Sequence, residues 1–196
     1  MRVKICGITN LEDALNAIAA GANALGFVFY KSSARYISVE DALEIVNALP
    51  PFVQTVGLFV NENEALINDV CCKAKMQLAQ IIDDEEKLDY SKIAPKTIRV
   101  VRAKSQNDIY ANKNQYILVD AFVESFGGEG KRVALEWFED MDCSKIILAG
   151  GLKASNLCEL KRFNFFGVDV SSGVEAYPGK KDREKMIDFV KAAHEL

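Results

Sequence analysis

The sequence has little of what marks several classes of protein. Its 196 residues include 4 prolines, 12 glycines and one histidine, and the 24 Lys and Arg do not outnumber the 28 Asp and Glu. So little proline and glycine excludes a collagen-like or low-complexity chain. A formal charge of −4 leaves no basic excess to neutralise nucleic-acid phosphates. Nucleic acid is therefore not expected as a partner.

Long apolar runs and cysteines at metal-binding spacing are also missing. No run approaches the roughly 18 apolar residues that span a bilayer, and residues 1–7 lack the apolar stretch of a signal peptide. We therefore expect a cytoplasmic protein without a membrane partner. The five cysteines are odd in number and show no C-x-x-C spacing, which predicts neither a disulfide framework nor a metal site.

What the sequence does contain is a series of short apolar runs. Runs without polar alternation indicate strands that are covered on both faces, as in a parallel sheet. Eight candidates lie at residues 3–6, 24–29, 56–60, 76–82, 97–102, 116–119, 146–149 and 165–170.

Helical patterns lie between these runs, most clearly at residues 11–18, 42–49 and 186–193. Candidate helix starts are Thr9 with Glu12, Ser38, and Asn61 three residues before Glu64; residues 103–114 form the weakest helix. The alternation predicts a single α/β domain over 1–196, either a compact (β/α)8 barrel with short helices or an open doubly wound sheet. Periodicity does not choose between them.

Two residues at predicted strand ends are candidates for proton transfer. Cys6 ends the first strand just before a helix start, where it is either a base or nucleophile, or a packed core cysteine. Asp120 ends the sixth strand, where an apolar floor tends to raise the pKa of a carboxyl group towards general-acid use. The alternative for Asp120 is a helix cap or turn.

Other candidates indicate an anion site. Gly150 and Gly151 follow the seventh strand, and Ser172 and Gly173 follow the eighth. Loops after these two strands are the common phosphate site of barrels, although each glycine alone could be a turn residue. Arg35, in the loop after the second strand, could bind a carboxylate or phosphate, or lie on the surface.

Together, these segments resemble the phosphoribosylanthranilate isomerase family of tryptophan biosynthesis. The resemblance spans residues 2–182 and rests on KICGIT (4–9), SARYIS (33–38), VD (119–120) with GGEG (127–130), LAGGL (148–152), and VDVSSGVE (168–175) with PGKKD (178–182).

The resemblance implies a (β/α)8 barrel that rearranges N-(5-phosphoribosyl)anthranilate without metal or cofactor, as a monomer or homodimer. It implies Cys6 as general base, Asp120 as general acid and Arg35 beside the anthranilate. A cysteine base requires a lowered pKa, which the helix start and Lys4 would supply in part.

The carboxyl-terminal end of the barrel is called its mouth below. There the resemblance implies that Asp169 binds the substrate and that Gly150, Gly151, Ser172 and Gly173 bind its phosphate. Three departures are Ala79-Gln80 in place of the family's His-Gly, Ala34 in place of a proline, and Glu129 within the glycine loop. The first concerns how the aromatic half of the substrate is held. Two alternatives remain, a silent sugar-phosphate binding protein and an isomerase for the related histidine-pathway substrate.

Overall fold

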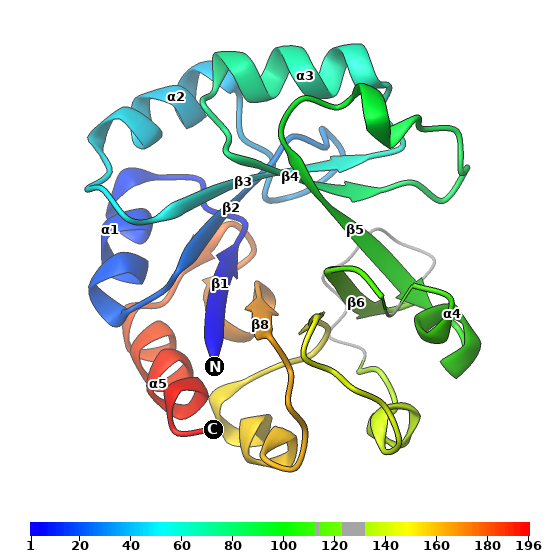
Figure 1. The fold of residues 1–196 in the computed structure, drawn as a ribbon. Coiled ribbons are helices and arrows are strands. Elements are labelled where there is room, and N and C mark those ends of the chain that lie inside the picture. Colours follow the sequence, from blue (N-terminus) through cyan, green and yellow to red (C-terminus); the bar gives the residue numbers. More distant parts are fainter. Residues whose placement is uncertain (113, 123–131) are drawn as a thin grey trace.

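The chain closes into a parallel barrel. The computed structural model describes residues 1–112, 114–122 and 132–196. Its eight barrel strands pair in chain order, and β8 pairs with β1 to complete the ring (Figure 1). They are β1 (Arg2–Cys6), β2 (Ala24–Val28), β3 (Gln54–Val60), β4 (Leu78–Ile82), β5 (Lys96–Ala103), β6 (Ile117–Ala121), β7 (Ile146–Leu148) and β8 (Gly167–Val170). This closure confirms the predicted barrel and rules out the open sheet.

Short helices surround the barrel (Figure 1). The α-helices are α1 (Leu11–Ala20), α2 (Val39–Ala48), α3 (Glu64–Lys73), α4 (Gln106–Tyr110) and α5 (Arg183–His194). The 3-10 segments are η1 (Tyr90–Lys92), η2 (Leu135–Phe138), η3 (Ala154–Leu160) and η4 (Ser172–Val174). A small hairpin of β9 (Glu175–Tyr177) and β10 (Lys180–Lys181) precedes α5.

The apolar core has two parts because each barrel strand has an inner and an outer face. The outer part lies between the barrel and the surrounding helices. The smaller inner part contains Val60, Ile82, Ile98, Val100, Leu118 and Ala149. Strands covered on both faces explain why the apolar runs show little alternation.

After β6 and β7, the described residues form the 3-10 segments η2 and η3. Phe138 of η2 is fully buried, and its ring lies 5.0 Å from that of Phe165 in an edge-to-face arrangement. Large aromatic side chains bury much apolar area per residue. Phe138 and Phe165 thus contribute to the outer part of the core on this side of the barrel.

Two of the three predicted helix starts are wrong. Ser38 caps α2 as predicted and accepts a hydrogen bond from Asp41 N. The cap of α1 is Asn10, because the Thr9 hydroxyl instead donates to Gly179 O at 2.6 Å. The cap of α3 is Asn63. Asn61 has a left-handed φ of 50° and accepts from Asp84 N.

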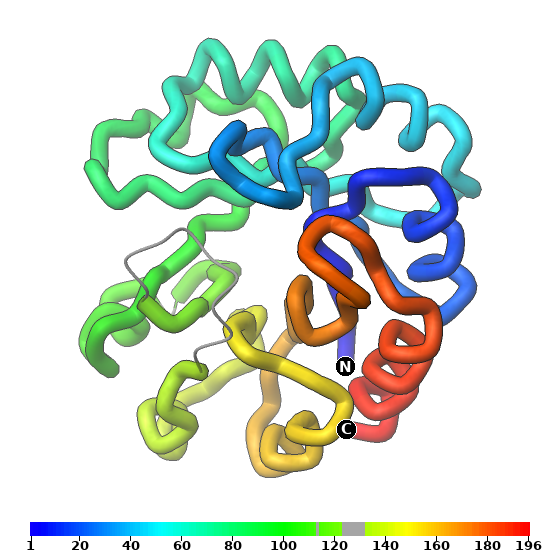
Figure 2. Tube along the Cα trace, turned by 180° about the vertical axis from the view of Figure 1, so that it is seen from behind, coloured from blue at the N-terminus to red at the C-terminus, as the bar shows by residue number. Residues whose placement is uncertain are grey.

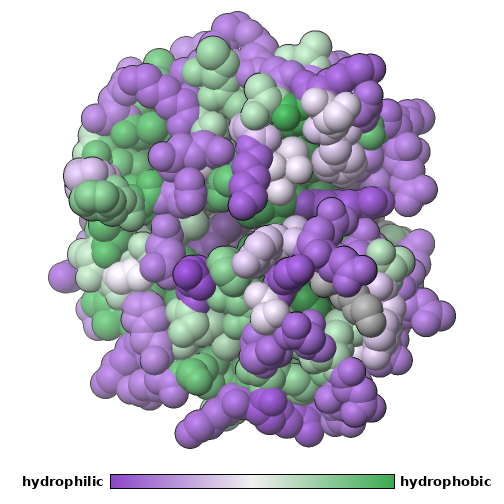
Figure 3. All heavy atoms as spheres, in the orientation of Figure 1, coloured by the Kyte–Doolittle hydropathy of each residue, from purple (hydrophilic) through white to green (hydrophobic). Residues whose placement is uncertain are grey.

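Hydrophilic side chains cover much of the face in Figure 3, with hydrophobic residues gathered between them. Within the described ranges, no helix combines the length and apolar character that crossing a bilayer would need. From the opposite side, the loops after β2 and β8 lie close together (Figure 2), in agreement with the ion pair between Arg35 and Glu175. The GGEG segment of the sequence analysis, 127–130, lies outside the described residues.

Candidate active site

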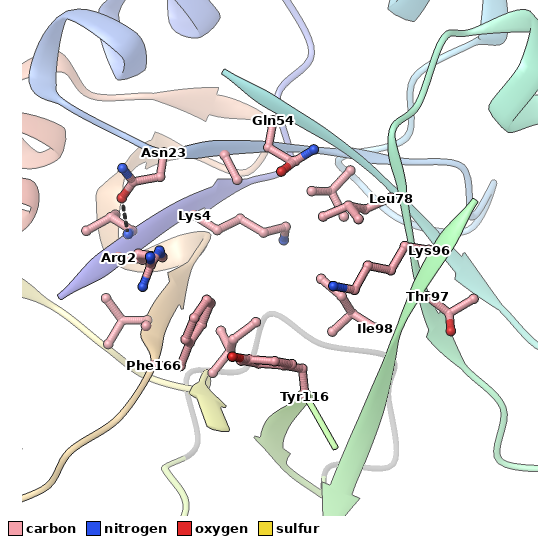
Figure 4. A pocket seen from close by; sticks show the side chains of 16 residues that line it. Arg2, Lys4, Asn23, Gln54, Leu78, Lys96, Thr97, Ile98, Tyr116 and Phe166 are labelled. Atoms are coloured by element: carbon pink, nitrogen blue, oxygen red, sulfur yellow. Dashed lines mark hydrogen bonds between the residues drawn. The ribbon is translucent and has the colours of Figure 1, made fainter. Parts of the chain in front are cut away.

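Cavities lie at both ends of the barrel, and the predicted proton-transfer groups line the smaller one. The larger, about 590 Å³, is lined from the beginnings of the strands (Figure 4). There Arg2 lies 4.5 Å over the Phe166 ring, and Tyr116 packs edge-on against Phe166. The smaller cavity, about 100 Å³, opens at the strand ends and is lined by Cys6, Asp120 and Asp169 among others. We place the candidate site in this smaller cavity because the side chains that could transfer protons line it.

Lys4 lies between the two cavities. Its side chain lines the larger one, and its Nζ donates to Asp169 Oδ1 at 2.8 Å, with both side chains less than one-tenth exposed. Lys4 and Cys6 stand two residues apart on β1 and therefore face the same side of the strand. Burial disfavours the ammonium, but Asp169 and Cys6 outweigh it and raise the pKa of Lys4. A protonated lysine therefore lies beside the thiol.

Gly26 of β2 makes room for this pair. A Cβ at Gly26 would lie 2.8 Å from Cys6 Sγ and 2.9 Å from Lys4 Nζ. Cys6 itself is buried. A side chain at position 26 would collide with Cys6 and Lys4, so the neighbouring strand β2 carries a glycine there.

The environment of Cys6 does not give the lowered pKa that the sequence led us to expect. Burial raises the pKa of the thiol, and Asp169 raises it further, while Lys4 and Lys181 lower it only in part. Without substrate, Cys6 is therefore a protonated thiol. The helix start and Lys4 do not overcome desolvation, because a thiolate removed from water loses its hydration.

Asp120 has the properties of a general acid. Burial, with a smaller contribution from the charge of Asp169, raises its pKa from 3.8 to about 6. The Ala121 N–H, at 2.8 Å from Asp120 Oδ1, and Arg102 oppose this rise. The predicted apolar floor is present, since Leu118 and Val100 line the same cavity. A carboxyl group that titrates near neutrality can both give and take a proton.

Arg35 lines this cavity and is held by a buried carboxylate. Its Nε and Nη2 donate to the two carboxylate oxygens of Glu175 at 2.8 and 2.7 Å. Lys181 Nζ donates to Glu175 Oε1 at 2.9 Å. Burial opposes ionisation of Glu175, but these hydrogen bonds outweigh it and lower its pKa. Gly7 is needed beside Arg35, because its φ is 78° and a Cβ would lie 2.7 Å from Arg35 Cδ.

The two predicted phosphate loops are in contact. Gly150 and Gly151 have left-handed φ values of 87° and 60°. A Cβ at Gly173 would lie 1.9 Å from Leu152 O, so the loop after β8 packs directly on the backbone of the loop after β7. Ser172 and Gly173 belong to η4. Gly173 therefore has a structural role at the contact between these loops, and the left-handed backbone at positions 150 and 151 favours glycine there.

Sequence reasoning did not assign Glu175, Lys181, Gln80 or Arg102 to the site. The Arg35 partner lies 140 residues away, so no local pattern could have found it. The two-residue period of β4 would have predicted that Gln80 faces the same side as Leu78 and Ile82.

A closed parallel barrel with a titratable carboxyl group and a buried thiol at its carboxyl-terminal end defines an acid–base enzyme of the (β/α)8 class. The family model described as N-(5'phosphoribosyl)anthranilate (PRA) isomerase matches residues 3–192. An N-(5'-phosphoribosyl)anthranilate isomerase of a Nitratiruptor species is 58% identical, covering 98% of each chain. The chain belongs to the phosphoribosylanthranilate isomerase family.

Solved structures agree over the whole chain. One is a phosphoribosyl anthranilate isomerase in complex with reduced 1-(o-carboxyphenylamino)-1-deoxyribulose 5-phosphate, which is 40% identical with a TM-score of 0.82. Another comprises monomers of the dimeric enzyme from Thermotoga maritima, 34% identical with a TM-score of 0.82. Each covers 100% of both chains compared.

Proposed function

We propose that this isomerase converts N-(5-phosphoribosyl)anthranilate to 1-(2-carboxyphenylamino)-1-deoxyribulose 5-phosphate in tryptophan biosynthesis, with Asp120 as general acid and Cys6 as general base. The observation that carries the proposal is their placement on one small cavity, where burial raises the pKa of Asp120 to about 6. Family membership supplies the reaction.

In the first step, protonated Asp120 gives its proton to the ring oxygen of the ribose. The bond from C1 to this oxygen breaks, and the nitrogen lone pair forms the Schiff base at C1. In the second step, the thiolate of Cys6 removes the proton from C2, and the electron pair of that bond forms the enolamine. Protonation at C1 and loss of the C2 hydroxyl proton then give the ketone.

The raised pKa of Cys6 is compatible with this sequence of steps. The first step places a positive charge on the Schiff base, next to the C2 atom that Cys6 must reach. An adjacent cation favours the thiolate, in the same direction as Lys4 and Lys181. The cationic intermediate therefore lowers the pKa of the thiol at the step in which Cys6 acts as base.

The remaining proposed contacts involve other residues at the carboxyl-terminal end of the barrel. Arg35 binds the anthranilate carboxylate, oriented by Glu175, and Asp169 is the second buried carboxylate beside the reacting carbons. Gly150, Gly151, Ser172 and Gly173 bind the phosphate through backbone N–H groups and the serine hydroxyl.

Loss of substrate fluorescence during turnover tests the proposal. Cys6→Ala and Asp120→Asn should each lower kcat at least about 100-fold, because general acid and base groups contribute roughly 10²- to 10⁴-fold. Circular dichroism checks that each variant folds. Near-normal turnover by either variant would contradict its role, and binding without turnover by the wild type would favour the silent binding protein.

Two further proposals concern substrate range and assembly. Assay of the histidine-pathway aminoimidazole substrate beside the anthranilate substrate separates the two isomerase activities. The chain is a monomer or homodimer, since the Thermotoga maritima relative is described as dimeric. Light scattering distinguishes a particle of 21.7 kDa from one of twice that mass.

A further inference from the structure

Gln80 carries a buried polar atom that the fold does not use. Its side chain lines the same cavity as Cys6 and Asp120 and is 3% exposed. Among the residues the structure describes, no hydrogen-bond donor meets its Oε1. Buried carboxamide oxygens usually accept a hydrogen bond, because moving such an oxygen out of water without a replacement partner costs free energy. An unpaired acceptor in an active-site cavity indicates a ligand that brings the donor.

The surroundings of Gln80 restrict which part of the substrate it can meet. Its register neighbours on β3 and β5 are Leu58 and Ile98. The cavity wall nearby is apolar, with Val60 and Ile82 among its residues. In a closed barrel of eight strands in chain order, β4 lies across from β8, which carries a proposed phosphate loop. The phosphate end of the substrate therefore points away from Gln80, and its aromatic end points towards it.

Chemistry then narrows the donor. The phosphate and the carboxylate of the substrate are acceptors at neutral pH. The ribose hydroxyls can donate, but they lie on the phosphate side of C1. At the aromatic end, the nitrogen between C1 and the ring carries an N–H. On the basis of the proposed function, we propose that Gln80 is a substrate-binding residue whose Oε1 accepts a hydrogen bond from this N–H.

This contact strengthens as the reaction proceeds. Ring opening places positive charge on the nitrogen, and a fixed carbonyl dipole in a desolvated cavity stabilises charge better than it stabilises a neutral amine. The contact therefore lowers the barrier to ring opening more than it improves substrate binding. Its loss should appear mainly in kcat rather than in KM.

Gln80→Met tests the proposal, because methionine has a similar length and no hydrogen-bonding amide. We expect kcat/KM to fall about 10- to 100-fold, the range for losing a hydrogen bond to a charged group, with most of the loss in kcat. The thermal midpoint should not fall, since the free protein loses no protein hydrogen bond at Oε1. A residue with a merely structural role would show the opposite pattern, a lower midpoint with normal turnover.

The matched control is Gln54→Met, which makes the same change at the other end of the barrel. Gln54 is exposed, and its Nε2 donates to Gln77 Oε1 at 3.2 Å. We expect its kcat/KM to stay within about twofold of the wild type, well below the loss of one hydrogen bond.

A second variant, Gln80→Glu, keeps an acceptor oxygen and should recover most of the kcat lost in Gln80→Met. The inference is overturned if Gln80→Met stays within about twofold of the wild type, or if Gln80→Glu is no better than Gln80→Met. Wild-type turnover in the same assay separates this failure from failure of the proposed function. Calorimetric titration with reduced 1-(o-carboxyphenylamino)-1-deoxyribulose 5-phosphate adds a direct measure, since this amine keeps the N–H and should bind Gln80→Met more weakly.

Discussion

Replacing Asp120 with asparagine should stabilise the fold at neutral pH while it removes activity. Burial raises the pKa of this carboxyl group from 3.8 to about 6. The folded protein therefore holds a proton over a pH range in which the unfolded chain has already released it. Because 1.36 kcal/mol corresponds to one pKa unit, this difference amounts to about 3 kcal/mol of lost stability at neutral pH.

The sign of the effect gives the prediction its pH dependence. Between pH 3.8 and about 6 the folded state binds more protons than the unfolded state, so the stability of the wild type falls as pH rises through this window. Asparagine does not titrate, and its amide oxygen can still accept from Ala121 N. The Asp120→Asn variant should match the wild type near pH 4 and exceed it by up to about 3 kcal/mol above pH 6.

Urea unfolding followed by circular dichroism at several pH values between about 4 and 8 measures this difference. Asp188→Asn is the control, because Asp188 is an exposed carboxylate on α5, and it should show no comparable gain. A stability difference that does not change with pH, or a loss of stability at neutral pH, would refute the argument from desolvation.

Three further substitutions test the packing around the site. Glu175→Gln breaks the buried pairing with Arg35 and Lys181 and should cost about 3–5 kcal/mol at neutral pH; because the pKa of Glu175 is lowered, the loss should shrink in acid, and a constant loss in urea titrations would contradict this. Gly26→Ala places a methyl group 2.8 Å from Cys6 Sγ and should lower kcat as well as stability by about 1–3 kcal/mol; unchanged kcat would argue against the thiol as base. Gly173→Ala would put its Cβ 1.9 Å from a backbone oxygen, so steady-state assays should show KM raised at least tenfold, about 1.4 kcal/mol, and a normal KM would remove this loop from the phosphate site.

Much of the fold could be predicted because each barrel strand leaves a local signal. An apolar run covered on both faces is typical of a buried strand, and each of the eight runs overlaps a barrel strand. The N-terminal caps of the helices were harder to predict, because several neighbouring residues could fill the capping position. Thr9 and Asn61 both make tertiary hydrogen bonds instead, to Gly179 and Asp84.

By itself, the sequence determined which residues could reach the mouth. Cys6, Asp120 and Asp169 stand on strands near their carboxyl ends, and in a parallel barrel all such positions meet at one end. Their roles in catalysis stay predictions for the experiments above.

Only the tertiary structure decided how these groups behave. A pKa depends on burial and on charges brought from distant parts of the chain, and Lys4 meets Asp169 across 165 residues. Burial thus raises the pKa of Cys6, whereas the helix start and Lys4 were expected to lower it in part, and Arg35 is held by Glu175. The tertiary structure also decided that the sheet closes. The pairing of β1 with β8 joins the first and last barrel strands, which are distant in the sequence, and local periodicity carries no signal of such a contact.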